Sequence, residues 1–254
     1  MAKELLKIRN LYASYGEEPV LRNITFDIPE GGIFCIVGES GSGKSTLLKA
    51  VLGLDRVLVT GGDILYEGRS LPGLPDRERR KLLGREIGLI PQNPAGSFNP
   101  TRRLRAQIRE TVESQGMAYS EKAAVEAFGA VGLTNPEKVL SSRPYELSGG
   151  MNQRIAIAAA MLPEPRLLLC DEATSALDVV TAGAVVDELL SLSKSRNTAL
   201  LMVTHHLGIA KRMSDRIGIM KDGQLIETGS TEEVLARPRE EYTRRLLAAV
   251  PRLS

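Results

Sequence analysis

The chain has 254 residues, 43% of them hydrophobic, which is enough for a large core in one domain or in a domain with a sizeable insertion. It carries 33 basic and 31 acidic residues and no Trp, a composition that argues against a nucleic-acid partner, an acidic lipid surface or a base-stacking platform. Neither a secretory leader nor an apolar run near the roughly 20 residues of a membrane span is found, so we expect a cytoplasmic protein that reaches a membrane only through partners.

Apolar runs and turn residues predict the elements in chain order. Strands are expected at 5–15, 20–28, 31–38, 61–68, 85–92, 166–173 and 198–206, and a hairpin at 217–229 around Asp222-Gly223. Helices are expected at 44–54, across most of 107–140, from the residues after 150 to about 161, at 179–195 and in the tail. Apolar strands that alternate with helices indicate an α/β fold with a sheet covered on both faces.

The helical stretch 93–161 interrupts this alternation and is interpreted as an inserted helical subdomain. We therefore predict one domain over 1–254. Its nucleotide-binding core covers 1–92 and 162–230, and residues 231–254 form a helical tail.

A glycine-rich segment, GESGSGKST, follows the buried strand at 31–38 and opens a helix. This is the setting of a phosphate-binding loop, in which backbone N–H groups and the positive end of the helix face the phosphates. Lys44 can reach the β- and γ-phosphates, and the Ser45 hydroxyl can bind Mg²⁺. The predicted nucleotide-binding residues of this loop are Gly38, Glu39, Ser40, Gly41, Ser42, Gly43, Lys44, Ser45 and Thr46.

A second buried strand, LLLCDEA, ends in two acids. Asp171 is placed to hold Mg²⁺ through water, and Glu172 to orient or deprotonate an attacking water. Together with the loop, these acids favour hydrolysis of a nucleoside triphosphate. Lys44 and Asp171 are 171 − 44 = 127 residues apart, with the helical stretch between them, and no base-reading NKxD segment is found. Adenine is therefore preferred over guanine.

The chain closely resembles the ATP-binding subunits of ABC transporters over essentially its whole length. The motifs occur in the family's order: the Walker A loop, Gln92 in IPQNP (the Q-loop), LSGGMNQR (the signature), LLLCDEA (Walker B), SALD (the D-loop) and VTHH (the switch, His205). Tyr15 matches the aromatic residue that stacks on adenine. The resemblance implies an ABC-type P-loop NTPase fold, a mixed sheet with an N-terminal antiparallel part and the helical insert.

The resemblance also implies how ATP and Mg²⁺ are held. Two such subunits pack head to tail, so that Ser148, Gly149 and Gly150 contact the γ-phosphate bound by a partner, as glycine N–H groups at a helix start can. The implied catalytic residues are Lys44, Gln92, Glu172 and His205, and the implied metal-binding residues are Ser45, Gln92 and Asp171. The implied partners are a second ATPase subunit, two transmembrane permease subunits and, indirectly, an extracytoplasmic substrate-binding protein, with the chain on the cytoplasmic face of the membrane.

A narrower resemblance concerns QNPAGSFNP, residues 92–100, and the tail, which look like those of peptide and nickel importer ATPases. Many peptide-importing members carry a cysteine-rich extension that binds an iron–sulfur cluster. Those cysteines are not found here, which shifts weight toward metal chelates without deciding the cargo. Such importers commonly use two different ATPase subunits, so a heterodimer is plausible beside a homodimer. A soluble ABC-type ATPase of a metabolic complex, such as phosphonate cleavage, stays open as an alternative, and a DNA-repair or translation ATPase is disfavoured.

Two positions depart from the family pattern. Asn152 stands where the signature often has a basic residue, and His206 stands where an Asp usually follows the switch histidine. Each leaves the phosphate-contacting groups in place, so any effect falls on coupling. The basic run DRERRKLLGR is interpreted as a solvated helix face, and the arginines after Gln92 as contacts to the permease. Cys35 and Cys170 lie in apolar runs and are predicted to be buried free thiols.

Overall fold

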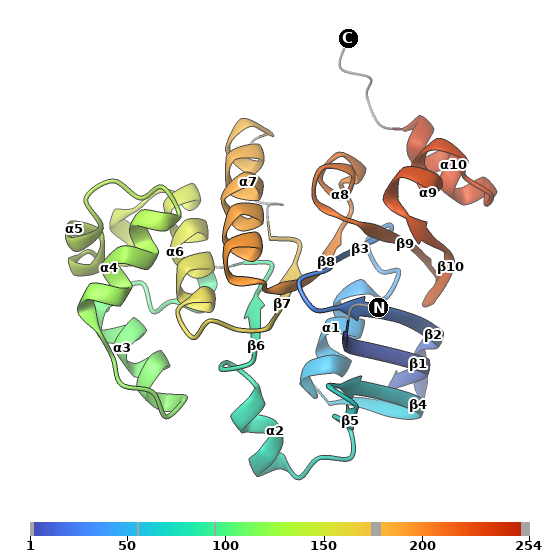
Figure 1. Cartoon of the computed structure of the whole chain (residues 1–254), viewed down its shortest axis with the longest axis horizontal. Helices are drawn as coiled ribbons and strands as arrows, with labels where there is room; N and C mark the ends of the chain where they lie inside the picture. The colour runs from blue at the N-terminus through green and yellow to red at the C-terminus, as the bar shows by residue number, and fades with distance from the viewer. Residues whose placement is uncertain (1–2, 55, 94, 174–178, 250–254) are drawn as a thin grey trace. The chain divides into compact units, whose positions relative to one another are not determined.

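The computed structural model describes residues 3–54, 56–93, 95–173 and 179–249 (Figure 1). Contacts along the chain define two compact units. The first, here the loop unit, comprises residues 1–79 and 199–254. The second, the helical unit, comprises residues 80–198. The finer subdivision expected from the sequence, with its boundaries near 92, 161 and 230, stays a prediction.

The N-terminal part of the loop unit is an antiparallel sheet of order β2-β1-β4-β5. Its strands are β1 (Glu4–Tyr15), β2 (Glu18–Pro29), β4 (Val57–Tyr66) and β5 (Arg69–Ser70). Apolar side chains of β1 and β2 are buried in near alternation with exposed polar ones, as a half-buried antiparallel strand requires. The antiparallel part implied by the resemblance is thus confirmed.

The loop unit also contains strands β3 (Ile33–Val37), β8 (Ala199–Thr204), β9 (Arg216–Lys221) and β10 (Gln224–Ser230), in the order β10-β9-β3-β8. β3 is parallel to both β8 and β9, whereas β10 returns antiparallel to β9 through the expected hairpin turn. All residues of β3 and β8 are buried, which explains their unbroken apolar sequence. The helices of this unit are α1 (Lys44–Leu52), α8 (Leu207–Met213), α9 (Thr231–Ala236) and α10 (Glu241–Ala248).

The helical unit contains the parallel strands β6 (Ile87–Ile90) and β7 (Leu167–Asp171). The expected helical stretch resolves into α3 (Leu104–Ser114), α4 (Glu121–Ala130) and α5 (Pro136–Ser141), followed by α6 (Gly149–Met161) and α7 (Val179–Arg196) (Figure 1). Two 3₁₀ turns, η1 (Ala95–Ser97) and η2 (Pro144–Glu146), lie in the connections, and the basic run forms α2 (Asp76–Leu82) with most of its side chains exposed.

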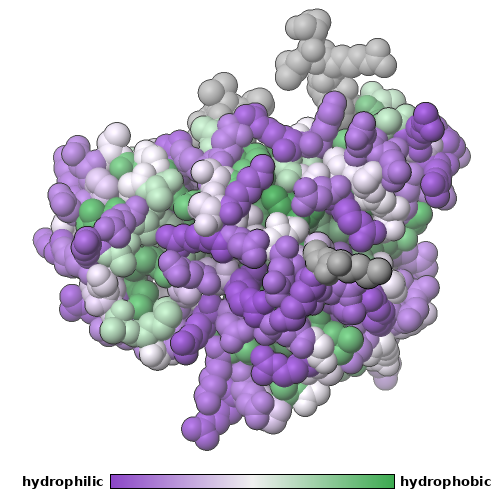
Figure 2. Space-filling view, in the orientation of Figure 1, coloured by the Kyte–Doolittle hydropathy of each residue, from purple (hydrophilic) through white to green (hydrophobic). Residues whose placement is uncertain are grey.

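Both cysteines are buried and neither forms a disulfide bond, as predicted. Burial raises the pKa of the Cys35 thiol to about 12, so this thiol stays protonated and unreactive at neutral pH. On the face drawn in Figure 2, hydrophobic residues form small areas separated by hydrophilic ones. Among the described residues, no helix combines the length and the hydropathy that crossing a membrane requires.

Candidate nucleotide-binding site

The phosphate loop, Gly38–Thr46, connects the carboxyl end of β3 to the amino end of α1. Gly41 (φ 83°) and Gly43 (φ 103°) have left-handed backbones that glycine adopts without strain. These two turns reverse the chain over a few residues and allow α1 to begin at Lys44, so that the N–H groups of the first helical turn lie at the loop.

Lys44 is buried, with 4% of its surface exposed, and its side chain lies back along the loop. The ammonium Nζ donates to the carbonyl oxygens of Gly38 (2.8 Å) and Glu39 (2.7 Å). A buried ammonium needs such partners, because burial without them costs several kcal/mol (about 2–7 even for a neutral polar group). The loop therefore fixes the position of its own cation before any ligand arrives.

The β9–β10 hairpin holds the loop from one side. A Cβ at Gly38 would lie 2.2 Å from the Met220 carbonyl oxygen, so only glycine fits there. The Gly223 N–H donates to the Ser42 carbonyl (3.0 Å). Gly223 has φ 77°, and a Cβ there would lie 1.9 Å from the Val20 carbonyl oxygen. Sequence reasoning identified Asp222-Gly223 only as a turn and missed this support, since turn glycines give no sign of what they pack against.

One side of the loop remains open. No heavy atom lies within 4 Å of a Cβ built on Gly41, and Glu39, Ser40 and Gly41 are exposed. Ser42 is buried, yet its hydroxyl oxygen has no hydrogen-bond partner in the described structure. A buried hydroxyl without a partner is unfavourable, and an oxyanion placed in the loop would satisfy it.

The register of the parallel strands brings the switch to the same edge as the loop. Val37 of β3 pairs with Thr204 of β8, so Gly38 and His205 both follow the carboxyl ends of neighbouring strands. In a continuing strand, the side chains of His205 and His206 would point to opposite faces. β8 instead ends at Thr204, and the two ring centroids are 3.9 Å apart with an interplanar angle of 44°. Strand alternation does not extend beyond the strand.

In the helical unit, the register of β6 and β7 joins two other predicted residues. Ile90 pairs with Cys170, so Gln92 and the acids Asp171 and Glu172 follow the same edge. Gln92 Nε2 donates to Glu172 Oε2 (3.1 Å). Glu172 has φ 46°, an uncommon conformation for a residue with a Cβ, which turns its side chain out of the line of the strand.

The signature turn, Ser148–Gly150, begins α6. Ser148 is the N-cap, and its hydroxyl oxygen accepts a hydrogen bond from the Met151 N–H (3.3 Å). A Cβ built on Gly149 would meet nothing within 4 Å, and the φ of Gly149 is not positive. Neither packing within this chain nor backbone strain therefore explains the glycine at 149.

Two residues of α6 that follow the signature turn stabilise it, and the sequence did not predict this role. Asn152, which departs from the family's usual basic residue, is buried, and its Nδ2 donates to the carbonyl oxygens of Pro144 (3.0 Å) and Leu147 (3.5 Å). Gln153 is buried and donates to the Ala173 carbonyl, just beyond Glu172. The Asn152 amide thus connects the signature helix to the segment that precedes it, and the Gln153 amide connects it to the residue after Glu172.

A second link joins the segment after Gln92 to the signature turn. Arg143 Nε donates to the Thr101 carbonyl (3.0 Å), and the Leu104 N–H donates to the Ser142 carbonyl (3.0 Å). The Arg143 N–H donates to the Glu146 carboxylate (2.8 Å). The two segments thus share one hydrogen-bonded network, which no local sequence pattern reveals.

Tyr15 is the last residue of β1, half-buried, and pairs with Glu18 of β2 and Val57 of β4. It belongs to the loop unit, as do the phosphate loop and His205. Gln92, Asp171, Glu172 and the signature turn belong to the helical unit. The D-loop, residues 175–178, lies outside the described residues.

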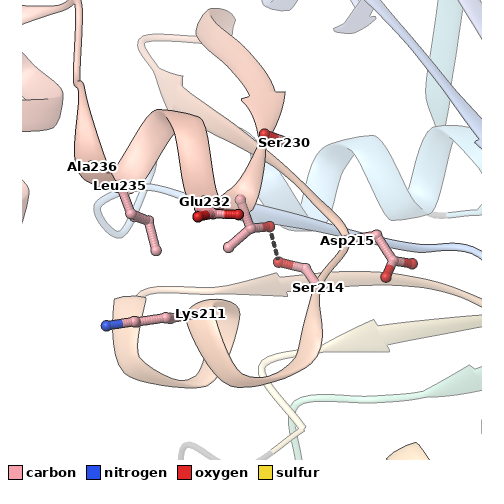
Figure 3. A pocket seen from close by; sticks show the side chains of 8 residues that line it. Lys211, Ser214, Asp215, Ser230, Glu232, Leu235 and Ala236 are labelled. Carbon is pink, nitrogen blue, oxygen red and sulfur yellow. Dashed lines mark hydrogen bonds between the residues drawn. The ribbon is translucent and has the colours of Figure 1, made fainter.

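A pocket of about 500 Å³ lies in the loop unit between α8, α9 and the start of β9 (Figure 3). Its Ser214 and Thr231 hydroxyl groups bond each other (2.8 Å), and the Asp215 carboxylate accepts the Ile33 N–H (2.9 Å). Its polar groups serve the fold, and none of the eight residues that line it is a predicted site residue. The phosphate loop is better supported as the site, because its geometry fits a defined chemical group.

Strand–loop–helix geometry with a buried lysine defines a P-loop nucleotide-binding protein. The family model described as ABC transporter matches residues 21–175. The chain is 38% identical to the oligopeptide transport ATP-binding protein OppD of Bacillus subtilis (strain 168), over 98% of this chain and 72% of that protein. It is 34% identical to the metal-staphylopine import system ATP-binding protein CntD of Staphylococcus aureus (strain Mu50), over 98% of this chain and 94% of that protein.

Solved structures agree with the fold. A dimeric post-hydrolysis state of the ATP-binding cassette MJ0796, bound to ADP and phosphate, aligns with TM-score 0.78 and 29% identity over 89% of this chain and 99% of that one. CbiO1 of Clostridium perfringens, part of an ABC transporter complex, aligns with TM-score 0.81 and 25% identity over 98% of this chain and 97% of that one. The chain belongs to the ABC transporter family, as an ATP-binding subunit whose ATPase activity energises transport.

Proposed function

We propose that this chain is the ATP-hydrolysing subunit of a membrane importer for peptides or metal chelates. The similar proteins serve oligopeptide transport and metal-staphylopine import, and the segment 92–100 has the sequence typical of that branch. The observation that carries the proposal is the open phosphate loop, where the buried Ser42 hydroxyl has no hydrogen-bond partner among the described residues and lies in the same loop as the buried Lys44. An anion in the loop would accept from the Ser42 hydroxyl and be attracted by the Lys44 ammonium.

The glycine at 149 supports a composite site. None of the described residues would contact a Cβ at position 149, and the backbone there does not require glycine, so the missing side chain leaves room for something outside the chain. N–H groups at the start of a thirteen-residue helix attract anions. We infer that the signature turn receives the γ-phosphate of an ATP bound to the phosphate loop of a second subunit, packed head to tail.

Within each site, we assign one role to each predicted residue. Lys44 neutralises the β- and γ-phosphates, Tyr15 stacks on adenine, and His205 donates to the γ-phosphate as charge develops. Glu172 takes the proton of the attacking water. Its carboxylate is already held by Gln92, which fixes its direction and makes Gln92 a reporter of nucleotide state to the segment that follows.

Ser45, Gln92 and Asp171 would supply hydroxyl, amide and carboxylate oxygens, the donors that Mg²⁺ prefers. The Gln92 Nε2 is directed to Glu172, which leaves Oε1 as its ligand atom. Bound Mg²⁺ neutralises phosphate charge. ATP binding closes the dimer, hydrolysis reopens it, and two permease subunits follow this population shift, with the chain peripheral to the cytoplasmic face.

Co-purification tests transport against the soluble alternative. The tagged chain, expressed from its own operon and extracted in mild detergent, should bring down a multi-span membrane protein and a second ATPase subunit or copy. Recovery with soluble enzymes alone would support the metabolic alternative instead.

Ser148→Arg tests the composite site. The bulky cation should block approach of the partner's ATP, so that ATP-induced dimerisation fails while the isolated chain binds nucleotide normally. Ser114→Arg, an exposed serine in the last turn of α3, is the matched control and should dimerise. Loss of nucleotide affinity by the isolated Ser148→Arg chain would mean that the signature acts on ATP bound by the same chain.

A further inference from the structure

One contact joins the C-terminal helix to the phosphate loop, although 203 residues separate them. The Glu39 N–H donates to the phenolic oxygen of Tyr242 (3.3 Å), in the first turn of α10. Both residues belong to the loop unit. The tyrosine is the second residue of α10, so a helix outside the nucleotide-binding motifs contacts the loop backbone directly.

The bonded peptide is the one that also holds Lys44. The Gly38 carbonyl and the Glu39 N–H belong to a single planar peptide unit. Its carbonyl accepts from Lys44 Nζ (2.8 Å), and its N–H donates to Tyr242. Hydrogen bonds at both ends of a peptide polarise each other and fix its rotation. Tyr242 is therefore one peptide away from the cation of the site.

The helix that carries Tyr242 is anchored independently of the loop. Glu227 of β10 is buried, and its carboxylate accepts the N–H groups of Arg239 (2.8 Å) and Glu240 (3.2 Å) and the Thr243 hydroxyl (2.5 Å). Lys221 Nζ lies 5.2 Å from the centre of the Tyr242 ring. Figure 1 shows α10 following α9, which packs on β10. The hydroxyl is thus presented to the loop by a fixed support.

We propose that Tyr242 is a positioning residue for ATP binding: its hydroxyl fixes the Gly38–Glu39 peptide, and through it Lys44, in the orientation that receives phosphate. The proposal rests on the proposed function of the loop. Burial, the largest cause, raises the pKa of Tyr242, and the Glu39 and Asp222 carboxylates add to this rise. The Glu39 N–H lowers the pKa but is outweighed, so the hydroxyl stays neutral at physiological pH and can accept from an N–H.

Tyr242→Phe tests the proposal because it removes the hydroxyl and keeps the ring. The full chain is titrated with AMP-PNP and Mg²⁺, and the assembled transporter is assayed for ATPase. We expect the dissociation constant and KM to rise about two- to tenfold, the range for losing one neutral hydrogen bond, with kcat within about twofold. The ¹⁵N–¹H resonance of Glu39 should shift, which a purely structural role in α10 would not require.

Tyr119→Phe is the matched control, because the Tyr119 hydroxyl is buried without a hydrogen-bond partner in the described structure. It should bind AMP-PNP like the wild type. Lys44→Ala separates the two claims. If the wild type binds and Lys44→Ala does not, the loop is the site, and unchanged affinity in Tyr242→Phe would then overturn this inference alone. If Lys44→Ala binds normally, the proposed function of the loop fails and this inference fails with it.

Discussion

The phosphate loop and the signature turn both place glycines and N–H groups at the start of a helix, but they are held in opposite ways. The loop is supported on one side by its own chain: the Met220 carbonyl excludes a side chain at Gly38, and the Gly223 N–H donates to the Ser42 carbonyl. The signature turn has support behind it from Asn152 but open space before Gly149. Glycines in the loop are required by this chain's own backbone, whereas the glycine at 149 leaves space for the partner's ATP that we propose.

This contrast separates nucleotide binding from turnover. A loop held by its own chain can bind ATP in the isolated subunit. Under the proposed function, a turn that is open in the isolated subunit contributes only after assembly. Changes near the loop should therefore alter affinity, and changes near the turn should alter closure and rate.

Glu172→Gln should have the largest effect, because it stops the chemistry and leaves both regions intact. The amide keeps the shape and the contact with Gln92 but cannot take a proton. Turnover should fall by roughly 10²–10⁴ while ATP binding persists and the dimer stays closed. ATPase assays and ATP-dependent size-exclusion chromatography measure this, with Glu126→Gln on the exposed face of α4 as control. Near-normal hydrolysis in a homodimer would remove Glu172 from the mechanism.

The two histidines sharpen the contrast on the loop side. His205→Ala should lower kcat by roughly 10²-fold or more, the scale of one lost transition-state donor. Because the rings are in contact, His206→Ala should have a smaller indirect effect, under about fivefold on the scale of a lost contact worth less than 1 kcal/mol. His206→Asp should be tolerated, since it restores the family's usual residue. If His206→Ala is inactive and His205→Ala active, the register of the switch is off by one.

Alanine at the two glycines tests the contrast directly. Gly38→Ala forces a Cβ against a backbone carbonyl that cannot move aside, and should lower the free energy of unfolding by about 1–3 kcal/mol. Gly149→Ala should change it by less than about 0.5 kcal/mol, yet lower the ATPase rate of the assembled transporter. Urea unfolding and ATPase assays give both quantities. Equal destabilisation by the two changes would show that Gly149 serves the fold after all.

The sequence predicted the elements well where their signals are local. Buried strands such as 33–37, the helix after Lys44 and the hairpin at Asp222-Gly223 were all found, because apolar runs and turn residues report their own conformation. The sequence did not predict the residues that support the site. Tyr242, Gln153 and Gly223 act on backbone groups far away in the chain, and no periodicity encodes a hydrogen bond to a distant carbonyl or N–H. Alternation along β8 does not predict the orientation of the two histidine rings, because the strand ends at Thr204, before both of them.

The smallest predicted effect concerns the support of the loop, and it depends on pH. Partial burial alone would raise the pKa of Glu227, but hydrogen bonds from the Arg239 N–H, the Thr243 hydroxyl and the Glu240 N–H outweigh it, and the net pKa is lowered. A carboxyl group with a lower pKa in the folded state binds protons more readily when unfolded. It therefore contributes stability above the unfolded pKa, near 4.3, and loses that contribution as the pH falls through the folded value.

Glu227→Gln should consequently lower the free energy of unfolding at pH 7 by about 1–3 kcal/mol, the range for hydrogen bonds to a charged group. The difference from wild type should stay constant down to about pH 5 and shrink below it, because there the wild-type carboxyl begins to be protonated in the unfolded chain. Urea unfolding from pH 7 to 4 measures it, with Glu17→Gln in the exposed β1–β2 turn as control. A difference that grows toward acid would mean that Glu227 is held as the neutral acid. In that case the protonated Glu227 carboxyl group would anchor α10 in place of the carboxylate. The anchoring of α10, and with it the position of Tyr242 at the loop, would then become more stable toward acid pH, whereas this structure predicts that it becomes less stable.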